Sequence, residues 1–204
     1  CQIAALGALA VLAGVQRGRL SEADAARHVE DLMAAPKLMA EALRLEEQIE
    51  ALASDLSQAE LVLYLGRDRF FPMALEGALK LKEISYIMAE GHAAGELKHG
   101  PIALIEEGVV AVVIAPMDAL FAKTRSSIEQ VRSRGASVIA ITDTPGAEAL
   151  GDAADHLVVL PEGGAMSAPL VAAVAVQLLA YHVAVHKGTD VDQPRNLAKS
   201  VTVE

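Results

Sequence analysis

Aromatic residues are scarce in this chain of 204 residues, at 3% of the sequence with no tryptophan. Hydrophobic residues still make up 53%, so the core must be built from Ala, Leu, Val and Ile, which is typical of helices packed on a parallel sheet. A single cysteine, Cys1, excludes an internal disulfide framework and fits a reducing compartment. We therefore expect a cytoplasmic α/β protein.

Positive charge is also in short supply. The 17 Lys and Arg residues are outnumbered by 27 Asp and Glu, which gives a formal net charge of -10. A surface with this balance repels the phosphate backbone of nucleic acids, so we exclude a nucleic-acid partner. Chemistry on small molecules stays open.

Several functional motifs are missing. The sequence has no GxGxxG, no GxxxxGK[ST] and no GxSxG. It therefore predicts neither a glycine-rich nucleotide-binding loop nor the nucleophile elbow of an α/β-hydrolase. His182 and His186 have the spacing of helical metal ligands, but no third ligand accompanies them, and we expect no metal and no cofactor. The most apolar segment, 165–187, is interrupted by Pro169 and Gln177, so it predicts a buried helix and no membrane partner.

The sequence begins with Cys1 instead of Met, directly before an apolar run at 3–12. We interpret this start as a cut inside a helix whose cap and preceding strand lie upstream, so the chain is expected to be a fragment. The printed sequence shows no charged leader followed by a signal-type apolar segment, which agrees with the expected cytoplasmic location.

The first quarter of the sequence has the apolar spacing of helices. Ser21 with Asp24 three residues later marks a helix start. Pro36 is expected to begin a further helix, which continues to about Leu56 with apolar side chains at spacings of three and four. We interpret this last helix as a connector.

From residue 61 onward, short apolar runs alternate with helical segments. The expected strands are 61–65, 109–115, 137–142 and 156–160, and the expected helices are 72–90, 118–134, 145–154 and 167–187. This alternation predicts a parallel sheet covered by helices on both faces and joined by right-handed crossovers. Sites in such sheets lie at the carboxyl ends of the strands, so we expect function in the loops after Leu65, Ala115 and Thr142.

Three ionisable side chains share one face of the helix that begins near Pro72. Glu76, Lys80 and Glu83 follow at spacings of four and three, which places them within roughly 60° of one another at about 100° per residue. A carboxylate beside a lysine can serve as a base for proton transfer. On an exposed face the same spacing is an ordinary ion pair worth roughly a few tenths of a kcal/mol.

Two further side chains could take part in chemistry. His99 lies between glycines in the segment 95–101, GELKHGP, where an imidazole can act as a general acid and base near neutral pH or can be a plain surface histidine. Lys199 lies in the polar tail 192–204, in which Pro194 and Asn196 set turns. It is either a placed amine on a segment that lies over a surface or a solvated lysine at a fraying end.

Four segments together resemble the carboxy-terminal part of the glutamine-fructose-6-phosphate aminotransferase family. They are LGR at 65–67, ALEGALKLKEI at 74–84, GELKHGP at 95–101 and KGTDVDQPRNLAKSVTVE at 187–204. The resemblance runs from about Leu61 to the end, and extends to the helices before it. It implies a three-layer sugar isomerase (SIS) domain of flavodoxin-like α/β fold at 57–188, preceded at 1–56 by helices left over from an upstream SIS domain and followed at 189–204 by a catalytic tail.

The resemblance also implies roles for individual residues. Glu83 matches the family's glutamate that moves a proton between the first two sugar carbons, and Lys80 matches its helix lysine. His99 matches a ring-opening histidine that serves the partner subunit of a homodimer. Lys199 matches the lysine that engages the open-chain ketose through its carbonyl, and Ala198 beside it is expected to contact the substrate.

The activity implied is conversion of fructose 6-phosphate and glutamine to glucosamine 6-phosphate and glutamate, a step of hexosamine biosynthesis. The glutaminase domain and the first SIS domain would be missing, so the fragment is expected to be inactive alone. Cys1 is followed by Gln2 instead of the family's Gly-Ile, and we do not identify it with the glutaminase nucleophile. The alternatives are a sugar-phosphate-binding SIS module without turnover and a purely structural dimerisation piece.

Overall fold

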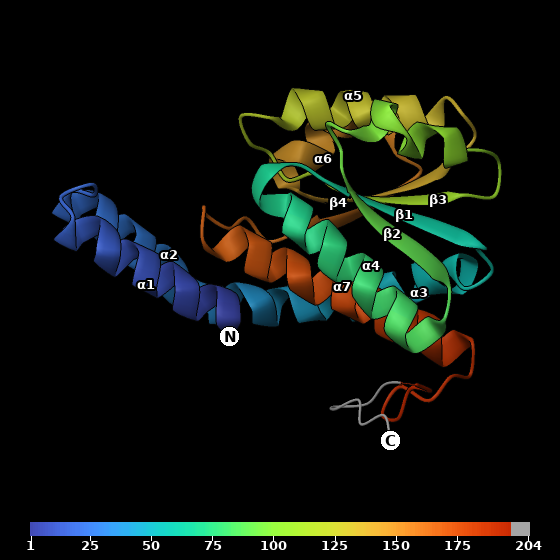
Figure 1. Ribbon diagram of the computed structural model, residues 1–204, viewed down its shortest axis with the longest axis horizontal. Helices are drawn as coiled ribbons and strands as arrows, with labels where there is room; N and C mark the ends of the chain where they lie inside the picture. The colour runs from blue at the N-terminus through green and yellow to red at the C-terminus, as the bar shows by residue number, and fades with distance from the viewer. Residues whose placement is uncertain (197–204) are drawn as a thin grey trace, which may run out of the picture.

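The computed structural model describes residues 1–196, in which a helical hairpin projects from an α/β unit (Figure 1). The hairpin consists of α1 (Gln2–Gln16) and α2 (Glu22–Ala42). Along α1, Val11 is buried and Leu6 is 66% exposed. Ala198 and Lys199 lie outside the described residues.

Within residues 1–196, five parallel strands form one sheet in the order β2-β1-β3-β4-β5. Tyr64 of β1 pairs with Gly91 of β2 on one side and with Val112 of β3 on the other. Four of these strands match the predicted strands to within one residue at each end. The strands are β1 (Leu61–Gly66), β2 (Met88–Ala93), β3 (Val110–Ile114), β4 (Ser137–Asp143) and β5 (His156–Leu160).

The edge strand β2 was not predicted, and the expected helix to residue 90 was wrong. The helix α4 (Phe71–Ser85) ends where Tyr86 takes a left-handed φ of 62°. The strand that follows has the sequence MAEGHA, in which Ala89 is buried, so it lacks the apolar run of a central strand. Gly91 is needed there because a Cβ would lie 2.8 Å from the Cα of Leu75 on α4.

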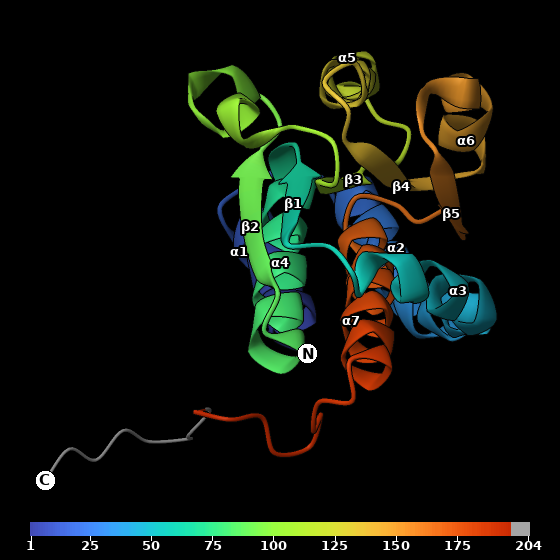
Figure 2. The same cartoon turned by 90° about the vertical axis from the view of Figure 1, so that its right-hand side faces the viewer.

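Helices cover both faces of the sheet, which confirms the three-layer architecture (Figure 2). One face packs against α3 (Glu46–Leu56), α4 and α7 (Ser167–His186), and the other packs against α5 (Phe121–Arg132) and α6 (Thr144–Leu150). Short 3₁₀ turns occupy Leu43–Leu45, Asp68–Phe70, Leu97–His99, Pro101–Leu104 and Gly151–Ala153.

The central helix α7 is apolar on all sides. By length and composition it could cross a membrane, but 72% of its most apolar window is buried inside the protein. It contacts α2, α3 and α4 as well as the sheet. This confirms the prediction of a buried helix.

The predicted helix start at Pro36 was also wrong. The Oγ of Ser21 accepts a hydrogen bond of 3.1 Å from the Asp24 amide, as expected, but α2 then runs through Pro36 to Ala42. A proline inside a helix costs about 3 kcal/mol. Burial of Ala35 and Ala42, with Met39 packed on the core of the sheet unit, outweighs this cost.

Asp31 joins the hairpin to the sheet unit. Its carboxylate accepts hydrogen bonds from the amides of Gly164 (3.1 Å) and Met166 (2.7 Å) and from the hydroxyl of Ser167, at the start of α7. Burial alone would raise the pKa of Asp31, but the hydrogen bonds from Ser167 and the backbone together lower it. A carboxylate at a helix N-terminus is stabilised by the helix dipole as well.

Replacing Asp31 by Asn is expected to lower the free energy of unfolding by about 1–2 kcal/mol at pH 7, because a neutral amide is a weaker acceptor for the N-terminus of α7. Chemical denaturation measures this difference, and Glu30→Gln, at an exposed neighbouring position on α2, is the matched control with no expected change. Because the folded pKa of Asp31 is lowered, its contribution is complete above about pH 4. The contribution is lost as the pH falls through the folded pKa, and a difference that stayed constant down to pH 2 would contradict this account.

Candidate active site

Lys80 and Glu83 form an ion pair in the last turns of α4. The Nζ of Lys80 lies 2.6 Å from Oε2 of Glu83, and the two side chains are 34% and 25% exposed. A charge-assisted hydrogen bond of this length fixes the direction of the carboxylate. The pair is thus half-buried, with one side open to solvent.

Glu76, the third member of the predicted face, makes a different contact. Its Oε1 accepts a hydrogen bond of 3.3 Å from Nε2 of Gln177 on α7. The structure therefore assigns Glu76 to the contact between α4 and α7 and leaves Lys80 and Glu83 as the pair.

The chain that leaves α7 returns to the end of α4. The hydroxyl of Thr189 lies 2.6 Å from the carbonyl oxygen of Ile84, and the amide of Arg195 donates to the hydroxyl of Tyr86 at 2.8 Å. The guanidinium of Arg195 also sits 4.0 Å from the centre of the Tyr86 ring, a cation–π contact. The described part of the tail thus lies over the residues that directly follow Glu83.

The contacts that hold the tail were not foreseen from the sequence. Tyr86 lies outside the segments that carry the resemblance, and Thr189 lies in the tail segment 187–204 but was given no role. The signal that could have found them is an aromatic residue directly after a helix in a chain with 3% aromatics, together with Arg195 as a cation in the tail.

His99 lies at the other edge of the sheet from the Lys80–Glu83 pair. It is exposed at the end of the Leu97–His99 turn, which follows β2. The six residues of β2 run between the end of α4 and this turn (Figure 2), a separation of roughly 17 Å at 3.3 Å per residue. Within one chain, the structure does not bring His99 to Glu83.

The expectation of a site at the carboxyl ends of the strands does not describe the Lys80–Glu83 pair, which lies near the amino edge. At the carboxyl edge, the carboxylate of Asp143 accepts from the amides of Met117 (2.9 Å) and Gly146 (3.0 Å). The hydroxyl of Thr142 donates to the carbonyl of Ala115 at 2.7 Å. The loops after β3 and β4 therefore use their polar groups to hold each other.

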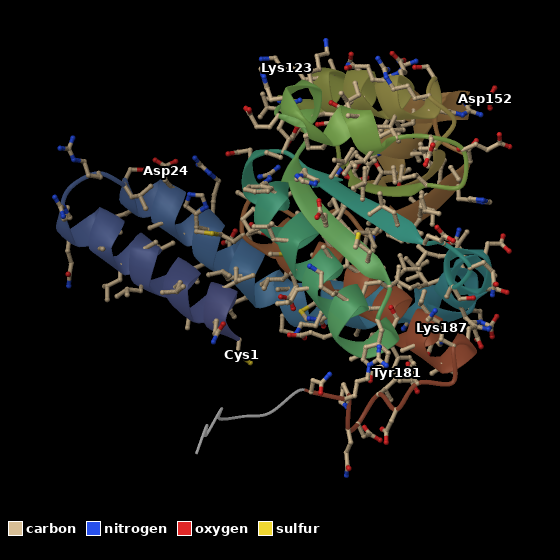
Figure 3. The ribbon with its side chains drawn as sticks, turned by 45° about the vertical axis from the view of Figure 1, so that its right-hand side comes forward. Cys1, Asp24, Lys123, Asp152, Tyr181 and Lys187 are labelled. Atoms are coloured by element: carbon tan, nitrogen blue, oxygen red, sulfur yellow. The ribbon has the colours of Figure 1, made fainter. Side chains whose placement is uncertain are left out.

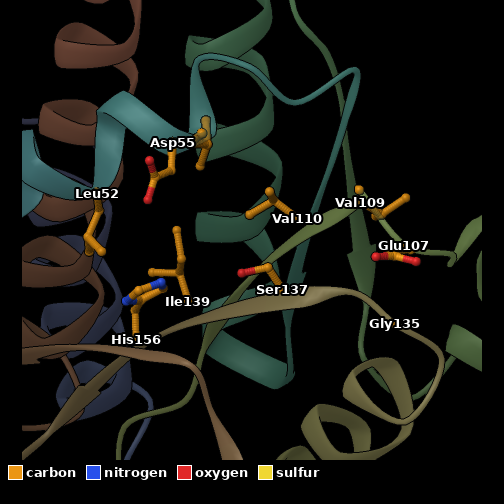
Figure 4. Close-up of a pocket in the computed structure, with 11 residues that line it drawn as sticks. Leu52, Asp55, Glu107, Val109, Val110, Gly135, Ser137, Ile139 and His156 are labelled. Atoms are coloured by element: carbon orange, nitrogen blue, oxygen red, sulfur yellow. The ribbon is translucent and has the colours of Figure 1, made fainter.

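A cavity of about 330 Å³ opens at the amino edge, between α3 and the starts of β3, β4 and β5 (Figure 4). Leu52 and Ile139 are among its apolar lining residues, and Asp55, Glu107 and His156 supply polar groups. Neither Lys80 nor Glu83 lines it. Its two carboxylates would repel a phosphate ester, so it does not suit a sugar phosphate.

Residues 1–196 contain no cluster of three His, Cys, Asp or Glu side chains arranged to hold a metal. Of the two histidines on α7, His182 places its Nε2 3.4 Å from a carboxylate oxygen of Glu46. This contact links α7 to α3.

The fold and the comparison with known protein families together define the class of this protein. The profile of the SIS domain family matches residues 55–187, and the chain belongs to this family. The whole chain is similar to glutamine–fructose-6-phosphate aminotransferases, with 57% identity over 204 residues to one from Bradyrhizobium diazoefficiens and 54% to one from Brucella abortus. It spans about a third (34%) of the length of these curated relatives.

A solved structure agrees with this similarity. The carboxy-terminal domain of glucosamine-fructose-6-phosphate aminotransferase from Francisella tularensis superimposes with a TM-score of 0.87 at 40% identity, covering 90% of this chain and 51% of that one. The resemblance found in the sequence is therefore confirmed over the described fold.

Replacing Tyr86 by Phe is expected to release the tail from the end of α4, because the Arg195 amide loses its acceptor. A net hydrogen-bond contribution of about 1 kcal/mol corresponds to roughly fivefold faster amide exchange at Arg195. Hydrogen exchange of a peptide covering 189–196 measures this rate. Tyr181→Phe, at an exposed tyrosine of α7, is the control that leaves the rate unchanged; equal rates in both variants and the wild type would show that the contact does not hold the tail.

Proposed function

We propose that this chain is the carboxy-terminal part of a cytoplasmic enzyme that converts fructose 6-phosphate and glutamine to glucosamine 6-phosphate and glutamate. It would supply the isomerase half-site without a metal or organic cofactor. The proposal is supported by 57% identity over the whole chain to a relative of that name. In this view residues 1–56 come from the end of a first SIS domain and the connector, 57–188 form the second SIS domain and 189–204 are the catalytic tail.

The docked tail is the observation that carries the proposal. Arg195 is held on Tyr86, which is three residues beyond Glu83. Lys199 follows Arg195 by four residues, which span at most about 14 Å of extended chain. A tether of this length is long enough for the proposed role, in which the amine of Lys199 meets the carboxylate of Glu83.

The chemistry needs this combination of groups. In the proposed route the amine of Lys199 engages the carbonyl of the open-chain ketose, with Ala198 beside the sugar. Lys199 forms an imine at the second carbon with release of water, and ammonia then replaces the lysine amine at that carbon. Glu83 takes a proton from the first carbon and returns one to the second. Lys80 holds the Glu83 carboxylate in position through its contact of 2.6 Å. A module that only binds sugar phosphate requires neither the proton carrier nor the amine.

Opening of the sugar ring requires a further acid and base, and we assign it to His99 of a second subunit. Support comes from the exposure of His99 on the turn beyond β2, remote from Glu83 of its own chain. In a homodimer the Leu97–His99 turn of each subunit would lie at the active site of the other subunit. This chain covers about a third of its relatives' length. We assign the glutaminase domain and the first SIS domain, which would bind the phosphate of the sugar, to the remaining part.

Complementation between two inactive variants tests both roles in the full-length parent. Glu83→Gln and His99→Gln are each expected to lower formation of glucosamine 6-phosphate by about 10²–10⁴-fold, as for loss of an acid or base. When the two variants are mixed and their subunits exchange, half of the dimers carry one intact site, so about a quarter of the wild-type activity should return.

The control is a mixture of two separately prepared His99→Gln samples, which contains no intact site and should stay inactive. Recovery in the mixed sample alone supports a site shared between subunits. Failure to recover activity, with subunit exchange shown by differently tagged chains, would contradict the assignment of His99 to the partner. Full activity of the Glu83→Gln variant would overturn the role of Glu83.

A further inference from the structure

The tail begins at Thr189, shortly after the end of α7. Gly188 takes a left-handed φ of 66°, and the amide of Thr189 donates to the carbonyl of Ala184 at 3.0 Å. This backbone pattern is a Schellman ending, which closes a helix without help from a side chain. The chain leaves α7 after Lys187 and turns back along the lower side of the molecule (Figure 3). The side chain of Thr189 is therefore free to make a further contact.

The hydroxyl of Thr189 makes that contact with α4. It lies 2.6 Å from the carbonyl oxygen of Ile84 and 3.0 Å from that of Ala184. A hydroxyl has one proton and donates to one carbonyl at a time, so the shorter distance assigns the donation to Ile84. Carbonyls in the last turn of a helix have no partner within the helix. Thr189 supplies such a partner to the residue directly after Glu83.

The segment that follows Thr189 is fixed as well. The carboxylate of Asp190 accepts hydrogen bonds of 2.9 Å from the backbone amides two and three residues later, which sets a turn. At the far end of the segment, the amide and the guanidinium of Arg195 both contact Tyr86. Both ends of the segment 189–195 are therefore held at the end of α4.

We propose that Thr189 is a positioning residue for the reaction. In this role it touches neither the sugar nor the reacting atoms. Its hydroxyl joins the start of the tail to the turn of α4 that carries Glu83, so that the amine of Lys199 and the carboxylate of Glu83 belong to one unit. A shift of about 1 Å between reacting groups can cost on the order of 100-fold in rate. The inference rests on the proposed function, which gives Lys199 and Glu83 their roles.

The alternative is a hydrogen bond that only stabilises the fold. Loss of such a bond lowers the equilibrium constant of folding by roughly fivefold, and it leaves the turnover of each folded molecule unchanged. Turnover per folded molecule therefore distinguishes a positioning role of Thr189 from a structural one.

Kinetics of Thr189→Val in the full-length parent test the positioning role. Valine keeps the branched shape and removes the hydroxyl, so we expect kcat for glucosamine 6-phosphate formation to fall by about tenfold or more. The KM for fructose 6-phosphate should stay within about twofold, because the first SIS domain is assigned the phosphate. Thr189→Ser keeps the hydroxyl and should restore kcat to within about threefold of the wild type.

Thr144→Val is the matched control. Thr144 is exposed at the start of α6, on the opposite face of the sheet from α4 and α7. The same loss of a hydroxyl there should leave kcat within about twofold of the wild type. Rates of all variants are referred to the folded fraction, which circular dichroism measures.

The role of Thr189 is overturned if Thr189→Val turns over at the wild-type rate, if only its KM changes, or if Thr189→Ser is as slow as Thr189→Val. Any of these results in a parent that forms glucosamine 6-phosphate would leave the proposed function in place. A wild-type parent that forms no glucosamine 6-phosphate would overturn the proposed function and the role of Thr189 with it.

Discussion

Burial of most of α7 is the constraint that organises this structure. An apolar helix of this length has to be covered by other elements, and here the sheet, α2, α3 and α4 cover it and leave a stripe with Gln177, Tyr181 and Val185 at the surface. At the first turn of α7, the carboxylate of Asp31 accepts hydrogen bonds that join the helical hairpin to the sheet unit. The same packing places the end of α7 beside the end of α4, so the chain leaving α7 meets the residues after Glu83.

This geometry places the candidate functional residues at two opposite edges of the sheet. The amino edge holds the Lys80–Glu83 pair and the described part of the tail, which carries Arg195 onto Tyr86. The carboxyl edge holds the exposed Leu97–His99 turn. Because β2 separates the two edges, one chain has the Lys80–Glu83 ion pair at one end and the His99 imidazole at the other, and the proposed homodimer would bring these two ends together.

Apolar runs and turn signals were sufficient to predict the central strands, the buried helix α7 and the α/β class, because burial determines those elements. They failed at β2, whose sequence MAEGHA is that of an edge strand, and at Pro36, where packing against the core outweighs a local helix breaker. For the site, helical spacing was enough to find Lys80 beside Glu83. The contact between the tail and Tyr86 and the separation of His99 from Glu83 depend on the tertiary structure, which no local sequence pattern encodes.

The central claim is that the tail delivers an amine to a carboxylate at the end of α4. Borohydride reduction of the full-length parent in the presence of fructose 6-phosphate tests it directly, because hydride added to an imine between lysine and the sugar carbonyl leaves a stable secondary amine. Peptide mapping should then find the sugar on Lys199. A sugar found on Lys80 or on another lysine, with Lys199 unmodified, would contradict the account.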